Sequence, residues 1–149
     1  MVRREVAYNS EVVSELTEEV QQEYVEGYGG RDATPVDAAE LAPPHGAFRV
    51  VEVDGLAIGC AGLRRQSDDD VEIKRLFVRP PFRRRGYARQ LLAELEERAR
   101  GEGSRRVVLE TGTKQSEALT LYRIAGYEPV PPSGHYRGDP LSRCFGKDL

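Results

Sequence analysis

Four arginines and two very small residues surround the expected start of a helix in segment 83–89. The arginines are Arg83, Arg84, Arg85 and Arg89, and the small residues are Gly86 and Ala88. The first turn of a helix carries N–H groups without intrahelical partners at the positive end of the helix dipole, so it attracts anions. Guanidinium groups suit phosphate oxygens, and a glycine lets a ligand approach the backbone closely. The segment therefore indicates a phosphate site; a solvated arginine-rich face is the alternative.

The helix that carries this turn is predicted from the spacing of apolar residues before Gly101. Its apolar stripe consists of Ala88, Leu91, Leu92, Leu95 and Ala99. These positions recur at the period of one helix face, and glycine is a common helix terminator. A strand at Val71–Val78 precedes the turn, and simple alternation would place Glu72, Lys74 and Leu76 on one face of it. Strand and helix together would hold the phosphate site between them.

The other elements follow from the same patterns and form one domain, residues 1–149. Expected strands are Val2–Tyr8, Gly46–Val53, Leu56–Arg65, Arg105–Glu110, Tyr127–Val130 and Leu141–Lys147; expected helices begin after Asn9 or Ser10, ending at Gly27–Gly30, and at Gln115, ending near Ala125. Asp54-Gly55 predicts a two-residue hairpin turn. Segment 27–46 reads as a loop or as a loop with a short helix around Pro35–Leu41. The connection through the central helix predicts that Val71–Val78 and Arg105–Glu110 are parallel.

Three of these segments carry a resemblance to a known family. Residues 83–88 read Arg-Arg-Arg-Gly-Tyr-Ala and fit the pattern R/Q-x-x-G-x-G/A, and residues 72–78 have the form E-I-x-x-hydrophobic-x-V. Residues 115–127 resemble the block N-x-x-A-x-x-L-Y-x-x-x-G-F/Y, with Gln115 in place of the asparagine. All three are similar to motifs of the GNAT-type N-acetyltransferase superfamily. The resemblance implies a GNAT-like α/β acyl-CoA N-acyltransferase fold, with a mixed, mostly antiparallel sheet flanked by helices on both faces.

The resemblance also implies acetyl-CoA as co-substrate and assigns residues to it. In this family the two parallel strands splay apart, and the pantetheine arm pairs with the exposed backbone between them. By this resemblance the main chain of Leu76, Phe77 and Val78 would bind pantetheine, and the pyrophosphate turn would comprise Arg83, Arg84, Arg85, Gly86, Tyr87, Ala88 and Arg89. Gln115 would offer its amide to the cofactor in place of the usual asparagine. No metal ligand set is expected, because neither Cys60 nor Cys144 has metal-ligand spacing.

Catalytic roles come from the same resemblance. An ammonium must lose a proton before its nitrogen attacks a thioester, and a phenol suits protonation of the departing thiolate. Glu72 matches a glutamate that serves as general base in one branch of the family, with a structural or substrate-orienting role as the alternative. Glu110 is the reserve candidate, and Tyr122 matches the family tyrosine that acts as acid.

The acceptor amine would lie against the segment that follows the first helix. The resemblance makes Tyr28, Asp32 and His45 candidate substrate contacts together with Glu110; the alternative for the first three is that they are ordinary loop residues. A histidine-based mechanism is not expected, because neither His45 nor His135 accompanies a nucleophile elbow.

The composition sets further bounds. The chain has 149 residues, 39% hydrophobic and 32% charged, with a net charge of −3. No apolar run is long enough to cross a bilayer and the N-terminus lacks an apolar signal region, so a cytoplasmic protein is expected. Residues 1–70 carry six Lys/Arg against fifteen Asp/Glu, whereas residues 71–149 carry sixteen against ten. The basic half contains the expected diphosphate site, and the acidic half argues against nucleic acid as partner.

The sequence thus predicts an N-acetyltransferase that moves the acetyl group of acetyl-CoA to a primary amine by direct attack in a ternary complex. Two alternatives remain open: a non-catalytic acetyl-CoA-sensing or protein-binding module on the same fold, and a nucleic-acid binder that uses the arginines of segment 79–89. The sequence does not identify the acceptor, which is a small molecule or a protein amine, nor does it distinguish a monomer from a homodimer.

Overall fold

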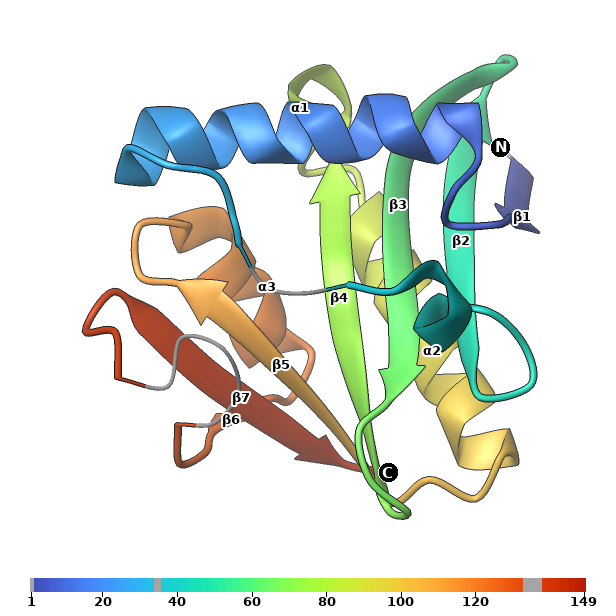
Figure 1. Ribbon diagram of the computed structural model, residues 1–149, viewed down its shortest axis with the longest axis vertical. Helices are drawn as coiled ribbons and strands as arrows, with labels where there is room; N and C mark the ends of the chain where they lie inside the picture. Colours follow the sequence, from blue (N-terminus) through green and yellow to red (C-terminus); the bar gives the residue numbers. More distant parts are fainter. Residues whose placement is uncertain (1, 34–35, 133–137) are drawn as a thin grey trace.

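A seven-stranded sheet with helices on both faces forms the molecule (Figure 1). The structure is a computed structural model that describes residues 2–33, 36–132 and 138–149. The strand order is β1-β2-β3-β4-β5-β7-β6, and neighbouring strands are antiparallel except for the parallel pair β4 and β5. Helix α1 crosses one face, and α2 and α3 cover the other (Figure 1). The predicted mixed, mostly antiparallel α/β architecture is confirmed.

The observed element bounds agree closely with the sequence pattern. The strands are β1 Val2–Glu5, β2 Gly46–Val53, β3 Leu56–Arg65, β4 Asp70–Val78, β5 Arg106–Gly112, β6 Glu128–Pro129 and β7 Ser142–Asp148. The helices are α1 Glu11–Tyr28, α2 Tyr87–Gly101 and α3 Ser116–Ile124, with short 3₁₀ turns η1 Ala38–Leu41 and η2 Pro80–Phe82. The short helix expected around Pro35–Leu41 is η1, although Pro35 itself lies outside the described residues, as does His135.

Two turns show how local sequence determines where helices and strands end. Asp54 and Gly55 have φ of 51° and 78°, as the predicted two-residue hairpin turn between β2 and β3 requires. Gly29 has φ of 78° and its N–H donates to the Val25 carbonyl, which ends α1 with a left-handed cap. Most residues with a side chain are strained at a φ of 78°, so glycine is favoured at positions 29 and 55.

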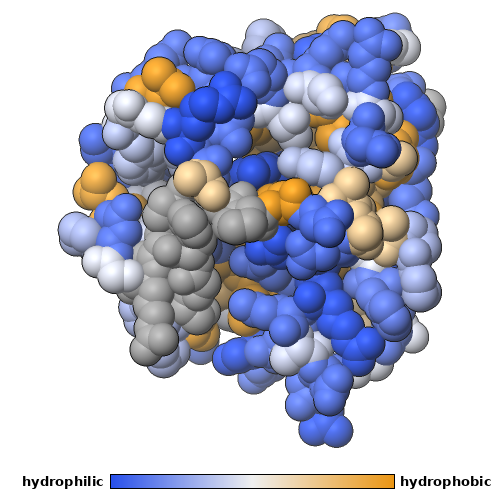
Figure 2. Space-filling view, viewed as in Figure 1, coloured by the Kyte–Doolittle hydropathy of each residue, from blue (hydrophilic) through white to orange (hydrophobic). Residues whose placement is uncertain are grey.

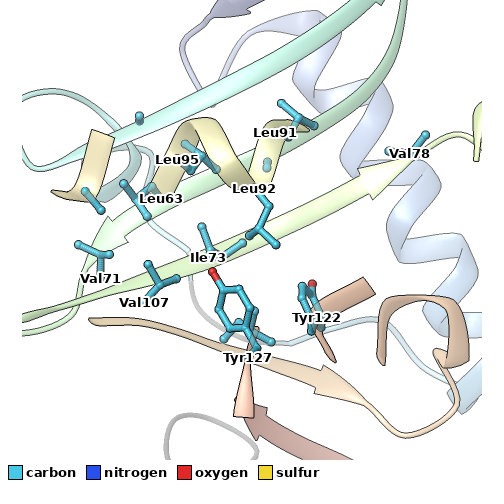
Figure 3. Close-up of a cluster of buried hydrophobic side chains, with 14 of the residues drawn as sticks. Leu63, Val71, Ile73, Val78, Leu91, Leu92, Leu95, Val107, Tyr122 and Tyr127 are labelled. Atoms are coloured by element: carbon cyan, nitrogen blue, oxygen red, sulfur yellow. The ribbon is translucent and has the colours of Figure 1, made fainter. Parts of the chain in front are cut away.

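The sheet separates two hydrophobic clusters, one on each face. On the α1 face, Val13, Leu16 and Val20 of the helix pack against Phe48 and Phe77 of the strands. On the other face, α2 presents Leu91, Leu92, Leu95 and Ala99, all buried, to the sheet. Figure 3 shows these leucines pointing at the strands, with Ile73 and Tyr127 beside them. The central helix is therefore anchored by the stripe that its sequence predicts.

Strand β4 contains a bulge that positions the site. Pairing with β3 shifts between Cys60 and Gly62, and Arg75 has a left-handed φ of 57°. The extra residue reverses the alternation, so Leu76 packs on the α2 face, whereas Glu72 and Lys74 lie on the α1 face. The expectation that Leu76 shares a face with Glu72 and Lys74 is therefore wrong, because it assumed an unbroken strand.

The outer surface on the α1 side is predominantly hydrophilic, with hydrophobic residues in small separate groups (Figure 2). Both cysteines are buried. Of the helices in the described ranges, none combines the length and the apolar character that a membrane span needs.

Candidate functional site

The parallel strands β4 and β5 diverge and leave a cavity between them. Their pairing is confined to Asp70–Glu72 and Arg106–Val108, and beyond it the two strands separate (Figure 1). The cavity measures about 270 Å³ and is lined by residues of α1, β4, β5, α3 and the segments beside them. Chemistry-bearing residues in the lining are Tyr24, Tyr28, Asp32, Lys74, Arg75, Glu110, Gln115 and Tyr122. The splayed strands that the family resemblance implies are present.

The residues that line the cavity come from both faces of the sheet. Lys74 and Glu110 belong to the α1 face, since they alternate with Ile73 and Leu109 of the opposite cluster. Tyr122 belongs to that opposite cluster and still lines the cavity. Charged groups and a phenol therefore meet in one cavity from opposite faces of the sheet.

Tyr122 is held by α3 in an apolar environment. Its ring lies 5.8 Å from the ring of Tyr127 and 6.4 Å from that of Phe145, measured between centroids, and the residue is 6% exposed. Burial raises the pKa of Tyr122 well above its ordinary value. The phenol is consequently protonated throughout the physiological range and is suited to donate a hydrogen bond or a proton.

Glu110 lies at the point where β5 leaves β4. Its neighbours on β7 are the Ser142 hydroxyl, which hydrogen-bonds the carboxyl group, and the Cys144 thiol, 3.8 Å away. Burial is the largest influence on this carboxyl group and raises its pKa, while the charge of Lys74 opposes the shift. A carboxylate with a raised pKa that faces a cavity is a suitable proton acceptor.

Glu72, unlike Glu110, lies outside the main cavity. It is 8% exposed, and its Oε1 accepts a hydrogen bond from Arg64 Nε at 2.7 Å. Arg64 also lies 3.6 Å from the half-exposed Glu40 of η1, so Glu72 belongs to a charge cluster under that turn. Glu72 does not line the main cavity, whereas it shares a small neighbouring void of about 10 Å³ with Glu110. Of the two candidate bases, Glu110 is the one that reaches the cavity.

The segment after α1 is fastened to the bulge of β4. Asp32 forms a buried ion pair with Arg75 Nη1, and the exposed fractions of their side chains are 6% and 7%. Gln21 supports the segment, because its side chain accepts from the Asp32 N–H at 2.7 Å and donates to the Asp32 carbonyl at 3.2 Å. Sequence patterns gave no signal for Arg75, because its partner is 43 residues away. Asp32 therefore borders the cavity and is held there by Arg75, and its contact with substrate stays a prediction.

Tyr28 and Gln115 tie the end of α1 to the loop between β5 and α3. The Tyr28 hydroxyl accepts from the Lys114 N–H at 2.9 Å, and the Gln115 Oε1 accepts from Gly112 N–H at 3.1 Å and Thr111 Oγ1 at 3.0 Å. A Cβ on Gly112 would lie 1.9 Å from the Tyr28 hydroxyl oxygen, so any larger residue there would displace the Tyr28 ring. Both side chains line the cavity, and both have structural partners.

The arginine-rich turn has the properties of an anion site. Gly86 has φ of 87° and stands as the N-cap of α2, without a side chain to bond the first N–H groups and without an acidic residue in the first turn. Arg84 also has positive φ, at 63°, and its side chain is 84% exposed. The backbone at Gly86 is open, because a Cβ there would meet nothing nearer than 3.8 Å. These features fit a diphosphate group.

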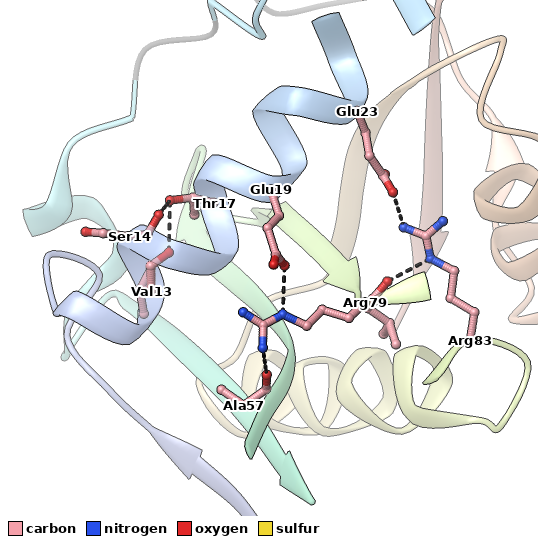
Figure 4. A network of polar contacts seen from close by, with 9 residues as sticks. Val13, Ser14, Thr17, Glu19, Glu23, Ala57, Arg79 and Arg83 are labelled. Atoms are coloured by element: carbon pink, nitrogen blue, oxygen red, sulfur yellow. Dashed lines mark hydrogen bonds and ion pairs between the residues drawn. The ribbon is translucent and has the colours of Figure 1, made fainter. Parts of the chain in front are cut away.

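Not every arginine of this turn is directed at the helix start. Arg83 donates to the Val78 carbonyl at 2.7 Å and pairs with Glu23 of α1, and its guanidinium lies 5.6 Å from the centroid of the Phe77 ring (Figure 4). Arg79 makes the equivalent connection to Glu19 and the Ala57 carbonyl (Figure 4). Arg83 therefore fastens the turn to α1, and its contact with phosphate stays a prediction.

The other members of the predicted turn differ in exposure. The Arg85 guanidinium lies 5.6 Å from the centroid of the Phe82 ring, and Arg89 is exposed on the first turn of α2. Tyr87 and Ala88 are partly buried against the α2-face cluster. Phe77 and Val78 pair with β3 through Cys60 and Gly59, so only their other strand edge is open toward the gap.

His45 has no place in the cavity. It is exposed directly before β2, where its Nδ1 lies 3.4 Å from Arg65 Nη1. The prediction that it contacts substrate is not supported, because η1 anchors this stretch to β3 through buried Leu41. In residues 2–33, 36–132 and 138–149 no cluster of three or more His, Cys, Asp or Glu side chains is arranged to hold a metal ion.

Comparisons with known proteins agree with this geometry. The model of the acetyltransferase (GNAT) family matches residues 13–127. An IAA acetyltransferase from Azospirillum brasilense is 33% identical over 140 residues, which cover 93% of this chain and 92% of that protein. A Klebsiella pneumoniae structure described as an acyl-CoA N-acyltransferase has a TM-score of 0.85 and 26% identity, with coverage of 99% and 97%. A GNAT acetyltransferase from Elizabethkingia anophelis with acetyl-CoA bound shares the fold, with a TM-score of 0.70, 16% identity and coverage of 99% and 97%.

Proposed function

Because this chain belongs to the GNAT acetyltransferase family, we propose that it transfers the acetyl group of acetyl-CoA directly to an amine bound between β4 and β5. The single observation that carries the proposal is the cavity itself, in which Glu110 and Tyr122 meet from opposite faces of the sheet. An acceptor that enters from the α1 face and a thioester that enters from the other would meet in the gap. Positioning of this kind lowers the barrier of a two-substrate reaction by several kcal/mol.

The cofactor contacts of the proposal follow the open backbone. Acetyl-CoA supplies an activated thioester carbonyl. The unpaired edge of β4 at Leu76, Phe77 and Val78 would receive the amide-containing arm, and the start of α2 at Gly86 would hold the diphosphate. Arg85 and Arg89 are available there, whereas Arg83 is engaged by Glu23. Arg84 is exposed and lies 3.3 Å from Glu117 of α3, so it would exchange a solvated ion pair for the diphosphate. The Elizabethkingia relative binds acetyl-CoA on the same fold, which supports this assignment.

Glu110 is proposed to accept a proton from the acceptor ammonium. An aliphatic ammonium has a pKa near ~10, so the reactive neutral amine is scarce at neutral pH without a base. The Glu110 carboxyl lines the cavity, and its raised pKa increases its basicity. Glu72, the first candidate from the sequence, would instead orient the site through Arg64.

Tyr122 is proposed to protonate the departing sulfur or to hydrogen-bond it. Thiols have pKa values near ~8.5, below that of a phenol whose pKa burial has raised, so the hydroxyl is protonated when the thiolate leaves. No side chain in the proposal acts as a nucleophile, and the amine attacks the thioester carbonyl directly.

Thiol release from acetyl-CoA in the presence of a broad amine panel tests the proposal. Turnover that requires an amine, with initial-rate lines that intersect when both substrates are varied, is the expected result. Parallel lines would indicate a covalent acyl-enzyme and would contradict direct transfer. Saturable binding of acetyl-CoA without turnover of any amine would instead favour a sensor on the same fold.

A further inference from the structure

We infer that the acceptor carries a carboxylate in addition to its amine, as an amino acid does, and that the Lys74 ammonium binds this carboxylate. The inference rests on the proposed function and specifies its substrate class. Its basis is a buried cation in the cavity wall that lacks a partner in the described part of the chain.

Lys74 is a cation of the cavity wall that forms no ion pair within the described ranges. The residue is 7% exposed and lines the cavity from β4. No ion pair and no hydrogen bond joins its ammonium to any residue in the three described ranges. A buried charge without a partner costs free energy, so such groups in proteins usually meet a counter-charge or a ligand.

The neighbouring charges are already engaged with one another. Arg75 pairs with Asp32, and Glu72 pairs with Arg64. Burial lowers the pKa of Lys74, while Glu72 and Asp32 raise it and Arg75 and Arg64 lower it further. Glu110, whose pKa the Lys74 charge lowers, is the remaining anion across the gap. The ammonium group of an acceptor would engage Glu110, which leaves Lys74 to bind an anion that arrives with the same acceptor.

Register places this cation opposite the proposed base. Glu72 pairs with Val108 at the last rung of the β4–β5 ladder, and two residues onward on each strand are Lys74 and Glu110. Both side chains belong to the α1 face, and the strands diverge between them. An acceptor with its amine toward Glu110 and a carboxylate toward Lys74 would span this gap. The cofactor does not supply the anion here, because its phosphates would lie at the start of α2.

Matched acceptors test the inference. Common L-amino acids are compared with their α-carboxamides and with the corresponding decarboxylated amines, and kcat/KM is measured from thiol release. The wild-type protein should favour the acids at least about tenfold over both neutral series, as expected for a hydrogen bond to a charged group. Lys74→Met, which keeps the side-chain length, should remove this preference by lowering kcat/KM for the acids alone, and Lys74→Arg should retain it.

The outcomes separate the inference from the function on which it rests. If amides and simple amines are acetylated as well as the acids, or if Lys74→Met slows all three series equally, the carboxylate inference is wrong and acetyl transfer stands. If no acceptor of any series is acetylated, both fail. Thermal unfolding of Lys74→Met near the wild-type midpoint, measured alongside, excludes loss of fold as the cause of a selective effect.

Discussion

The two sides of the gap between β4 and β5 differ in the side chains that they present. On the α1 side, charged groups dominate, with Arg75 paired to Asp32 and Glu110 and Lys74 beside them. On the α2 side, apolar residues such as Ile73 surround the single hydroxyl of Tyr122 at the cavity wall. The cavity between β4 and β5 is therefore polar on the α1 side of the sheet and apolar on the α2 side.

The difference separates two proton transfers. Removal of a proton from an ammonium is helped by a carboxylate, and ionic partners limit the cost of burying the charges around it. A phenol in apolar surroundings stays protonated, because burial disfavours its anion. The diphosphate would bind away from both proton-transfer residues, at the start of α2. Backbone N–H groups and exposed arginines would replace the water around its charges there.

The largest effect is expected from Gly86→Glu, on the α2 side. A carboxylate at this N-cap would repel the diphosphate and strain a residue at φ of 87°. Affinity for acetyl-CoA, measured by calorimetry, should fall by more than about 100-fold, which corresponds to two or three lost charge-assisted contacts. The shift in melting temperature that the cofactor causes should disappear with it.

Gly103→Glu is the matched control for this variant. Gly103 has nearly the same φ, 85°, and lies in open space beyond the C-terminal end of α2. It should therefore suffer the same backbone strain and keep normal affinity. Equal loss of binding in both variants would show that strain rather than anion repulsion is responsible.

The next largest effect is expected on the α1 side, from Glu110→Gln. Loss of a general base typically lowers kcat about 100-fold or more. The raised pKa of Glu110 places the acid limb of the wild-type pH–rate profile above the ordinary 4.5 of a glutamate, with activity lost as pH falls through it. Glu110→Gln should lose that limb, whereas Glu72→Gln should retain it.

Stability gives an independent check on the same residue. A raised carboxyl pKa means that the folded state favours the protonated form, so this group stabilises the fold at low pH and the benefit is lost as pH rises through its folded pKa. Glu110→Gln should accordingly unfold at the wild-type temperature or higher at neutral pH. A marked drop in melting temperature would assign Glu110 a structural role instead.

A smaller loss of rate is expected from Tyr122→Phe, because a thiolate is a good enough leaving group to depart without being fully protonated. The rate should fall about 10- to 100-fold, near the lower end for general acids. Tyr127→Phe is the control: Tyr127 lies in the same cluster, but its hydroxyl donates to buried Glu96 at 3.1 Å and is not in the cavity wall. That variant should lose stability and keep its rate, and a similar rate loss in both would argue against a direct role for Tyr122.

The sequence predicted local features of both sides better than long-range ones. The stripe from Leu91 to Ala99, the Asp54-Gly55 turn and the glycine at the start of α2 depend on neighbouring residues, and all are present. The bulge at Arg75 was missed, because alternation alone gives no sign of an inserted residue. Because of the bulge, Leu76 lies on the opposite face of the sheet from the one that alternation predicts. The bulge also places Arg75 beside Asp32, and this ion pair depends on the tertiary fold.

The arginines of the turn allow the finest comparison, because Arg84 forms only an exposed ion pair with Glu117, whereas Arg83 is bound to α1. Arg84 is 84% exposed beside the helix start, so Arg84→Met should weaken acetyl-CoA binding only about two- to fivefold, and less in high salt. Arg83 instead connects Val78 and Glu23, so Arg83→Met should lower the free energy of unfolding by about 1 kcal/mol, a value discounted for the partial exposure of the pair. Calorimetry and urea unfolding on both variants separate the two roles. If Arg83→Met weakened cofactor binding more than Arg84→Met without loss of stability, Arg83 would have to exchange Glu23 for the diphosphate when the cofactor binds.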